Sequence, residues 1–97
     1  MKTKIVNKYY IEYNKETDIM IMRPTKYGNP YKISCNGDRN NVIKLHYESL
    51  LMMEKSKLLE FLRPLVGKRL VCCCKPLKCH GDNYIKLIKK LKLEEDL

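Results

Sequence analysis

The sequence predicts a small single-domain α/β fold with two central parallel strands, extra strand structure at the N-terminus and two to three helices. A chain of 97 residues has the length of one domain with one modest core. Two apolar segments, at 19–22 and at 70–74 within an expected strand at 69–74, lack the alternation of half-buried strands, which favours strands covered on both faces. Helical sequence lies between them, and a helical crossover normally makes two buried strands parallel neighbours.

The N-terminal residues 1–17 are expected to form a variable strand or hairpin. β-Branched and aromatic residues favour one strand at 3–7 and a second, tyrosine-rich strand at 9–13, followed by a polar turn at 14–18. The family-like core is expected to cover 18–92. Within it, residues 24–37 contain two prolines and two glycines, which predicts an ordered loop without regular structure.

Three helical segments follow this loop. Asp38 is a candidate N-cap of a helix that runs to about residue 54, with His46 on its apolar face and therefore expected to be packed in the core. A shorter helix near 58–62 is expected to end at Arg63, because Pro64 restricts the preceding residue. The last helix begins at Gly81 or Asp82 and carries an apolar stripe made of Tyr84, Leu87, Ile88 and Leu91. Residues 93–97 form a short acidic tail.

Composition limits the environment and the partners. Twenty basic and eleven acidic residues give a formal charge of +9, which favours phosphate groups, nucleic acid or an acidic protein surface as partners. The first twenty residues lack the apolar segment of a signal peptide, and the longest apolar run is 70–74, so we expect a cytoplasmic protein that does not enter membranes. The odd number of cysteines, five, favours free thiols in a reducing compartment.

The predicted topology brings two distant segments together. The carboxyl ends of parallel neighbouring strands lie side by side, and ligands of open α/β sheets bind just beyond those ends. We therefore expect the loop at 23–30 and the turn at 75–82 to line one cleft.

Three motifs follow one another along the chain: Arg23-Pro24-Thr25-Lys26-Tyr27-Gly28-Asn29-Pro30-Tyr31, then Gly67-Lys68-Arg69-Leu70, then Cys72-x-Cys74-x-Pro76-Leu77-x-Cys79-His80-Gly81-Asp82. In this combination the chain resembles a widespread family of small domains of unknown function from bacteria and their phages, over about 18–87. That family commonly has tryptophan at the position of Tyr27 and an aromatic residue at the position of Cys73, so the resemblance implies a core-facing or packing role for Cys73. It implies no particular reaction.

The third motif concentrates reactive side chains. Cys72, Cys74, Cys79 and His80 supply three sulfurs and an imidazole, the ligand types that zinc prefers, although their spacing differs from the usual zinc knuckles. The alternative is that the thiols are buried and pack the strand. A third interpretation is catalytic: Cys79 near a helix N-terminus as a nucleophile, with His80 moving a proton or orienting a ligand.

The two residues after His80 have structural and functional interpretations. Asp82 is either a cap of the last helix or a group that holds a sugar hydroxyl or His80, which would complete a catalytic set with Cys79 and His80. Gly81 provides a conformation or a close approach that a side chain would block, and it is a candidate ligand-binding position.

The first motif suits an anionic ligand. Arg23 and Lys26 are cations at a strand end, Tyr27 offers a ring for stacking, Gly28 lets a backbone amide approach an anion, and Asn29 can donate and accept hydrogen bonds. The alternative is that Arg23 pairs with Asp82 or a carbonyl to join the two loops, while residues 28–30 only make a turn. The phosphate-binding pattern G-x4-G-K-[ST] is absent from the sequence.

Two functions follow as hypotheses. The first is a domain that binds a phosphorylated or nucleotide-like ligand in the cleft, with or without processing it. The second is a basic phage-type protein without catalytic activity, an inhibitor that acts on nucleic acid or on a nucleic-acid-handling host complex. Binding through basic surfaces weakens steeply as salt rises, whereas binding in a cleft depends on single residues.

Overall fold

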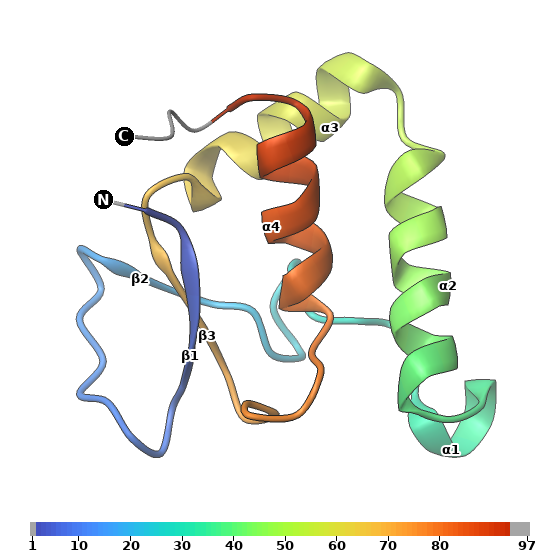
Figure 1. Cartoon of the computed structure of the whole chain (residues 1–97), viewed down its shortest axis with the longest axis horizontal. Coiled ribbons are helices and arrows are strands. Elements are labelled where there is room, and N and C mark those ends of the chain that lie inside the picture. Colours follow the sequence, from blue (N-terminus) through green and yellow to red (C-terminus); the bar gives the residue numbers. More distant parts are fainter. Residues whose placement is uncertain (1, 94–97) are drawn as a thin grey trace.

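The structure is a computed structural model that describes residues 2–93, so all but the first residue of the predicted acidic tail lies outside the described residues. Figure 1 shows strands and helices in the following order: β1 (Lys4–Asn7), β2 (Asp18–Met20), α1 (Ile33–Asn36), α2 (Arg39–Leu51), α3 (Lys55–Leu62), the 3-10 helix η1 (Arg63–Leu65), β3 (Arg69–Cys72) and α4 (Gly81–Lys90). Among the helices of this part of the chain, none combines the length and apolar character needed to cross a membrane.

The three strands form one parallel sheet in the order β1-β3-β2. Ile5 of β1 and Ile19 of β2 both pair with Leu70 of β3, and Leu70 is fully buried at the centre of the sheet. The predicted α/β class and the parallel pairing of the two inner strands are therefore confirmed. The predicted strand at 9–13 is wrong, because β1 pairs with β3 instead of forming a hairpin, and residues 8–17 contain turns.

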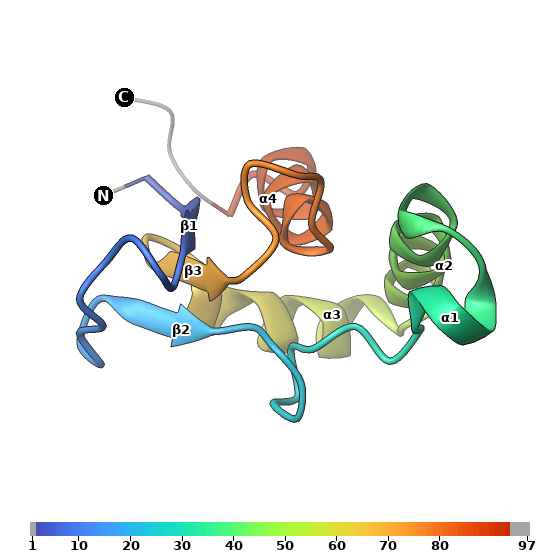
Figure 2. The same cartoon turned by 90° about the horizontal axis from the view of Figure 1, so that it is seen from below.

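The helices pack over one face of this small sheet, the face that carries Ile5, Leu70 and Ile19. Figure 2 shows α3 and α4 on the same side of the three strands, with the 8–17 segment on the other. The predicted stripe of α4 is confirmed, since Tyr84, Leu87 and Ile88 are buried. They pack in a core cluster with Leu62 and Leu65, which come from the α3 and η1 side.

The helix boundaries follow local chemistry. The Asp38 side chain accepts a hydrogen bond from the Asn41 amide at 2.8 Å, which confirms it as the N-cap of α2. The predicted end of α3 at Arg63 is confirmed, since α3 ends at Leu62 with Arg63 as its C-cap, and Pro64 lies in the first turn of the 3-10 helix η1, where its missing N–H costs nothing. The loop expected at 24–37 contains the short helix α1.

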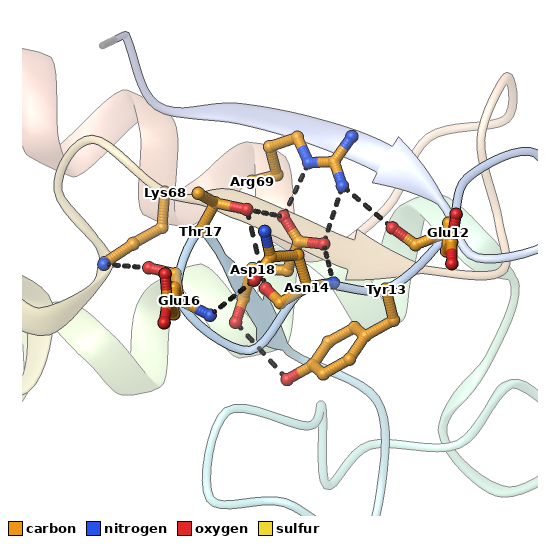
Figure 3. Close-up of polar contacts among 8 residues, drawn as sticks. All are labelled: Glu12, Tyr13, Asn14, Glu16, Thr17, Asp18, Lys68 and Arg69. Carbon is orange, nitrogen blue, oxygen red and sulfur yellow. Dashed lines mark hydrogen bonds and ion pairs between the residues drawn. The ribbon is translucent and has the colours of Figure 1, made fainter.

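A buried ion pair fixes the end of the sheet where β2 and β3 begin. Figure 3 shows Arg69 donating to both carboxylate oxygens of Asp18, at 2.6 and 2.7 Å. Asp18 also accepts from the Asn14 amide at 2.8 Å and the Thr17 hydroxyl at 2.9 Å. The bond to Arg69 holds the pKa of Asp18 well below its usual range. This network closes the 12–18 turn at the end of the sheet where β2 and β3 begin. We therefore expect a ligand site at the opposite end, beyond the carboxyl ends of these strands.

Candidate ligand-binding site

A cavity of about 240 Å³ lies beyond the carboxyl ends of β2 and β3. Its walls come from three segments: residues 22–31 after β2, residues 33–43 in α1 and the first part of α2, and residues 72–80 between β3 and α4. The first and third segments leave the same end of the parallel sheet (Figure 1). The two segments that sequence reasoning placed in one cleft therefore line one cavity.

Three cationic side chains line this cavity, from Arg23, Arg39 and Lys78. Arg23 donates to the Asn29 carbonyl at 3.0 Å, so its guanidinium closes its own loop, whereas the structural alternative predicted that it joins the two loops. Arg39 donates to the Lys78 carbonyl at 3.1 Å and so ties the start of α2 to the β3–α4 turn. Among the described residues that line the cavity, none is Asp or Glu. The site is therefore suited to anions.

Sequence reasoning missed Arg39 and Lys78. Arg39 lies outside the three motifs, and Lys78 occupies an unspecified (x) position in the third. The signal that was available is position: Arg39 follows the N-cap of the crossover helix, and Lys78 precedes the Cys-His pair. Both positions lie at the strand-end side of an α/β fold, where ligands bind.

Hydrogen bonds fix the orientation and tautomer of His80. Its Nε2 lies 2.8 Å from the Ile21 carbonyl and 2.9 Å from the Tyr27 carbonyl, and because carbonyls only accept, Nε2 carries the proton. Neutral Nδ1 is then an acceptor, 3.6 Å from the sulfur of Cys79. Burial lowers the pKa of His80. His80 thus joins the loop after β2 to the start of α4.

A second polar chain supports the same loop. The Tyr84 hydroxyl donates to the Tyr27 carbonyl at 2.7 Å and accepts a hydrogen bond from Nε2 of His46 at 3.2 Å. Nδ1 of His46 in turn accepts a hydrogen bond from the Asn83 side chain at 2.9 Å. Burial, with a smaller contribution from His80, lowers the pKa of His46 to about 4. His46 is therefore a neutral packed residue, as its place on the apolar helix face predicts.

Tyr84→Phe tests this chain. Removing the hydroxyl takes a donor from the Tyr27 carbonyl and leaves the buried His46 N–H without an acceptor, so we expect the free energy of unfolding to fall by about 1–2 kcal/mol. Urea unfolding followed by circular dichroism measures the change. Tyr10→Phe is the control, since Tyr10 is 81% exposed and its change should be near zero. Equal effects of the two substitutions would show that the hydroxyl of Tyr84 contributes nothing.

Two residues predicted to contact a ligand lie elsewhere. Tyr27 is 5% exposed, its ring packs against Phe61 with centroids 4.6 Å apart, and its hydroxyl donates to the Phe61 carbonyl at 2.9 Å. The ring therefore has no free face on which a base can stack, and that prediction is wrong. The Lys26 ammonium lies 5.2 Å above the Tyr27 ring and does not line the cavity.

The predicted roles of Gly28 and Asn29 also change. The Gly28 amide donates to the Thr25 carbonyl at 3.0 Å, so it closes a turn and is not available to an anion. A Cβ at Gly28 would lie 2.8 Å from the Arg23 backbone nitrogen, which explains the glycine by close packing. Asn29 lines the cavity, but its side chain donates to the Val42 carbonyl at 3.1 Å and accepts from the Tyr31 amide at 3.0 Å.

Gly81 and Asp82 are structural as well. A Cβ at Gly81 would lie 2.7 Å from Cδ1 of Ile21, so the glycine lets α4 approach the sheet and does not face the cavity. Asp82 lies in the first turn of α4 and accepts from the Cys79 amide at 3.3 Å. Since neither lines the cavity, only Cys79 and His80 of the predicted catalytic set do.

Four of the five cysteines, Cys72, Cys73, Cys74 and Cys79, line one wall of the cavity, but they do not form the predicted zinc-ligand group. In the described residues no three or more His, Cys, Asp or Glu side chains are grouped to hold a metal ion. Nε2 of His80 is held by two carbonyls. Cys73 was expected to face the core, yet it is exposed, because β3 ends at Cys72 and the strand alternation stops there.

The side chains of Cys72 and Cys79 shift each other's acidity in opposite directions. Interaction with the Cys79 side chain and with the backbone amides of Lys75 and Cys74 lowers the pKa of Cys72 to about 6. The same interaction and burial raise the pKa of Cys79. These directions favour Cys72 over Cys79 as a thiolate, and the catalytic role of Cys79 stays a prediction.

Comparison with known proteins gives a family without an assigned activity. A family described as "Domain of unknown function (DUF4326)" matches residues 6–90. An "Uncharacterized 12.4 kDa protein in nrdA-td intergenic region" of Enterobacteria phage T4 is 36% identical over 90 residues, which cover 91% of this chain and 79% of that protein. No solved structure matches the chain. The comparisons thus support the expected kinship with phage proteins.

Proposed function

Since this chain belongs to the family described as Domain of unknown function (DUF4326), the nature of its ligand has to be inferred from the site, and we propose that the cavity binds a small phosphorylated ligand of the mononucleotide type. The observation that carries the proposal is the charge of the walls. Arg23, Arg39 and Lys78 line the cavity, and among its described lining residues there is no carboxylate. Cations without neighbouring acids favour a phosphate dianion.

The volume of the cavity and its other lining residues limit which classes of ligand can bind there. A volume of about 240 Å³ lies just below the range typical of pockets for drug-sized ligands, about 300–1,000 Å³, and so favours a sugar phosphate or mononucleotide over a longer chain. Apolar side chains of Val42 and Ile43 form part of the wall, and Tyr31, half-buried, supplies the aromatic ring. These groups suit a sugar or base, while the cations suit the phosphate.

Calorimetric titration with nucleoside 5′-monophosphates and the matching nucleosides tests the proposal. We expect at least one monophosphate to bind and its nucleoside to bind at least about tenfold more weakly, because the charge-assisted hydrogen bonds to phosphate are lost. Arg39→Gln and Lys78→Gln should each weaken binding of the monophosphate by about tenfold. Lys78→Gln is the cleaner change, since the Arg39 guanidinium also holds the Lys78 carbonyl.

Lys89→Gln is the matched control. Lys89 is exposed on the last turn of α4 and does not line the cavity, so this variant loses the same charge without touching the site. Equal weakening by Lys78→Gln and Lys89→Gln would contradict the proposal. Binding of oligonucleotides alone, falling steeply with salt, would also contradict it and would favour the basic phage-type binder.

A further inference from the structure

The turn that follows β1 presents two exposed tyrosines. Tyr9 and Tyr10 are 71% and 81% exposed, and among the described residues no aromatic ring packs against either of them. Neither residue lines the cavity. Core packing therefore does not account for these two rings, and binding of a mononucleotide in the cavity does not account for them either.

Hydrogen bonds hold this turn in one conformation. The Asn7 side chain accepts from the Tyr9 amide at 2.8 Å, and the Asn7 carbonyl accepts from the Tyr10 amide at 3.0 Å. An asparagine side chain that bonds to the backbone two residues further on is a common way of fixing a turn. The two rings are thus attached to an ordered backbone, so a ligand that stacks on them does not have to order the turn.

The same turn is joined to one wall of the cavity. The Lys8 amide donates to the Cys72 carbonyl at 2.8 Å, and the Asn7 side chain donates to the Lys75 carbonyl at 2.7 Å. The two cysteines between these positions line the cavity. Figure 1 shows the end of β1 and the β3–α4 turn at the same end of the sheet. A ligand that leaves the cavity over this wall therefore reaches the two tyrosines.

Positive charge accompanies the tyrosines. The Lys8 ammonium lies 5.1 Å from the centroid of the Tyr9 ring, and Lys4 is also exposed. The sequence contains no Asp or Glu before Glu12, whose carbonyl accepts from Arg69 at the opposite end of the sheet. Lysines beside exposed aromatic rings suit single-stranded nucleic acid, because the rings stack on bases and the ammonium groups contact phosphates.

We propose that this turn extends the cavity into a site for single-stranded nucleic acid: the cavity holds the terminal nucleotide, and Tyr9 and Tyr10 stack on bases of the nucleotides that follow. The inference rests on the proposed function, because it takes the mononucleotide in the cavity as the end of a longer strand. A volume of about 240 Å³ leaves room for one nucleotide, so the rest of the strand lies on the protein surface.

Calorimetric titration of the full chain with a nucleoside 5′-monophosphate and with a 5′-phosphorylated DNA tetranucleotide tests the inference. The tetranucleotides carry each of the four bases in turn at the first position and thymidine at the other three. We expect at least one tetranucleotide to bind at least about tenfold more tightly than the monophosphate of its first nucleotide at the same salt concentration, because stacking adds to binding in the cavity. Equal affinities of the two probes would overturn the inference.

Replacing each tyrosine with alanine locates the stacking site. Tyr9→Ala and Tyr10→Ala should each weaken tetranucleotide binding by about tenfold and monophosphate binding by less than about twofold. Tyr13→Ala is the matched control. Tyr13 is 50% exposed in the same segment, but its hydroxyl donates to the Asp18 carbonyl at 3.3 Å, at the end of the sheet away from the cavity (Figure 3). Equal weakening of tetranucleotide binding by all three substitutions would overturn the inference.

Lys78→Gln separates a failure of this inference from a failure of the proposed function. If the cavity holds the terminal nucleotide, this variant weakens binding of both probes. Weakening by Lys78→Gln without any effect of Tyr9→Ala or Tyr10→Ala would retain the cavity as the ligand site and overturn the inference alone. Weakening by the two tyrosine variants only, with no monophosphate bound, would overturn both the proposed function and the place of the terminal nucleotide in the cavity.

Discussion

Replacing Tyr27 with alanine is expected to lower the free energy of unfolding by about 3–5 kcal/mol, the range for removing a large aromatic side chain from a core. The Tyr27 ring packs between Phe61 and Tyr84, with centroid distances of 4.6 and 5.8 Å. Its loss also frees the backbone that receives the hydrogen bonds of His80 and Tyr84. We therefore expect binding of a nucleoside monophosphate to fall together with stability. Urea unfolding and calorimetric titration measure the two effects.

Tyr27→Phe is the control for this substitution. It keeps the packed ring and removes only the 2.9 Å bond to the Phe61 carbonyl, so the cost should be about 1 kcal/mol and ligand binding should persist. If Tyr27→Ala abolished binding while leaving stability unchanged, the ring would be contacting the ligand, and its assignment to the core would be wrong.

Replacing Asp18 with asparagine is expected to lower the free energy of unfolding by about 2–3 kcal/mol, the upper part of the range for charge-assisted hydrogen bonds. The Asp18 side chain is fully buried, but Arg69 keeps 24% of its side chain exposed and is rehydrated when its partner is lost. The cost therefore stays below the ~3–5 kcal/mol of a fully buried pair. Urea unfolding at pH 7 measures the change, with exposed Glu48→Gln as the control.

The sign of the pH dependence follows from the direction of the shift. The pKa of Asp18 is lowered in the folded state by its bond to Arg69. Its stabilising contribution is therefore complete above the unfolded pKa of about 3.9 and is lost as the pH falls from there toward the folded pKa. The difference between wild type and Asp18→Asn should shrink between pH 5 and pH 3. A constant difference over this interval would contradict the assignment.

Sequence reasoning recovered the features that depend on local pattern. The apolar segments at 19–22 and 70–74, separated by helical sequence, predicted parallel β2 and β3, and the crossover rule then placed the two loops in one site. Asp38 as N-cap and the stripe of α4 also follow from local spacing.

The parts that could not be predicted depend on tertiary contacts. The sequence of residues 4–7 does not indicate that β1 pairs with β3. The tyrosine-rich segment at 9–13 was therefore predicted to be a second, neighbouring strand. Tyr27 is in a loop, and only its contact with Phe61 shows that the loop folds its ring inward. The arrangement of the cysteines depends on the turn at 73–78, which brings Cys79 back to the cavity wall but leaves no group of three metal ligands among the described residues.

The account depends most on the cavity between the loop after β2 and the β3–α4 turn as the place where a phosphorylated ligand binds. Two-dimensional amide NMR during titration with a nucleoside monophosphate tests this directly. We expect the shifted signals to cluster within 22–31, 33–43 and 72–80, the segments that contribute the lining of the cavity, with little change at the exposed Lys86, Lys89 and Lys90 of α4. Shifts confined to that lysine-bearing face, or to the 8–17 segment, would contradict the account.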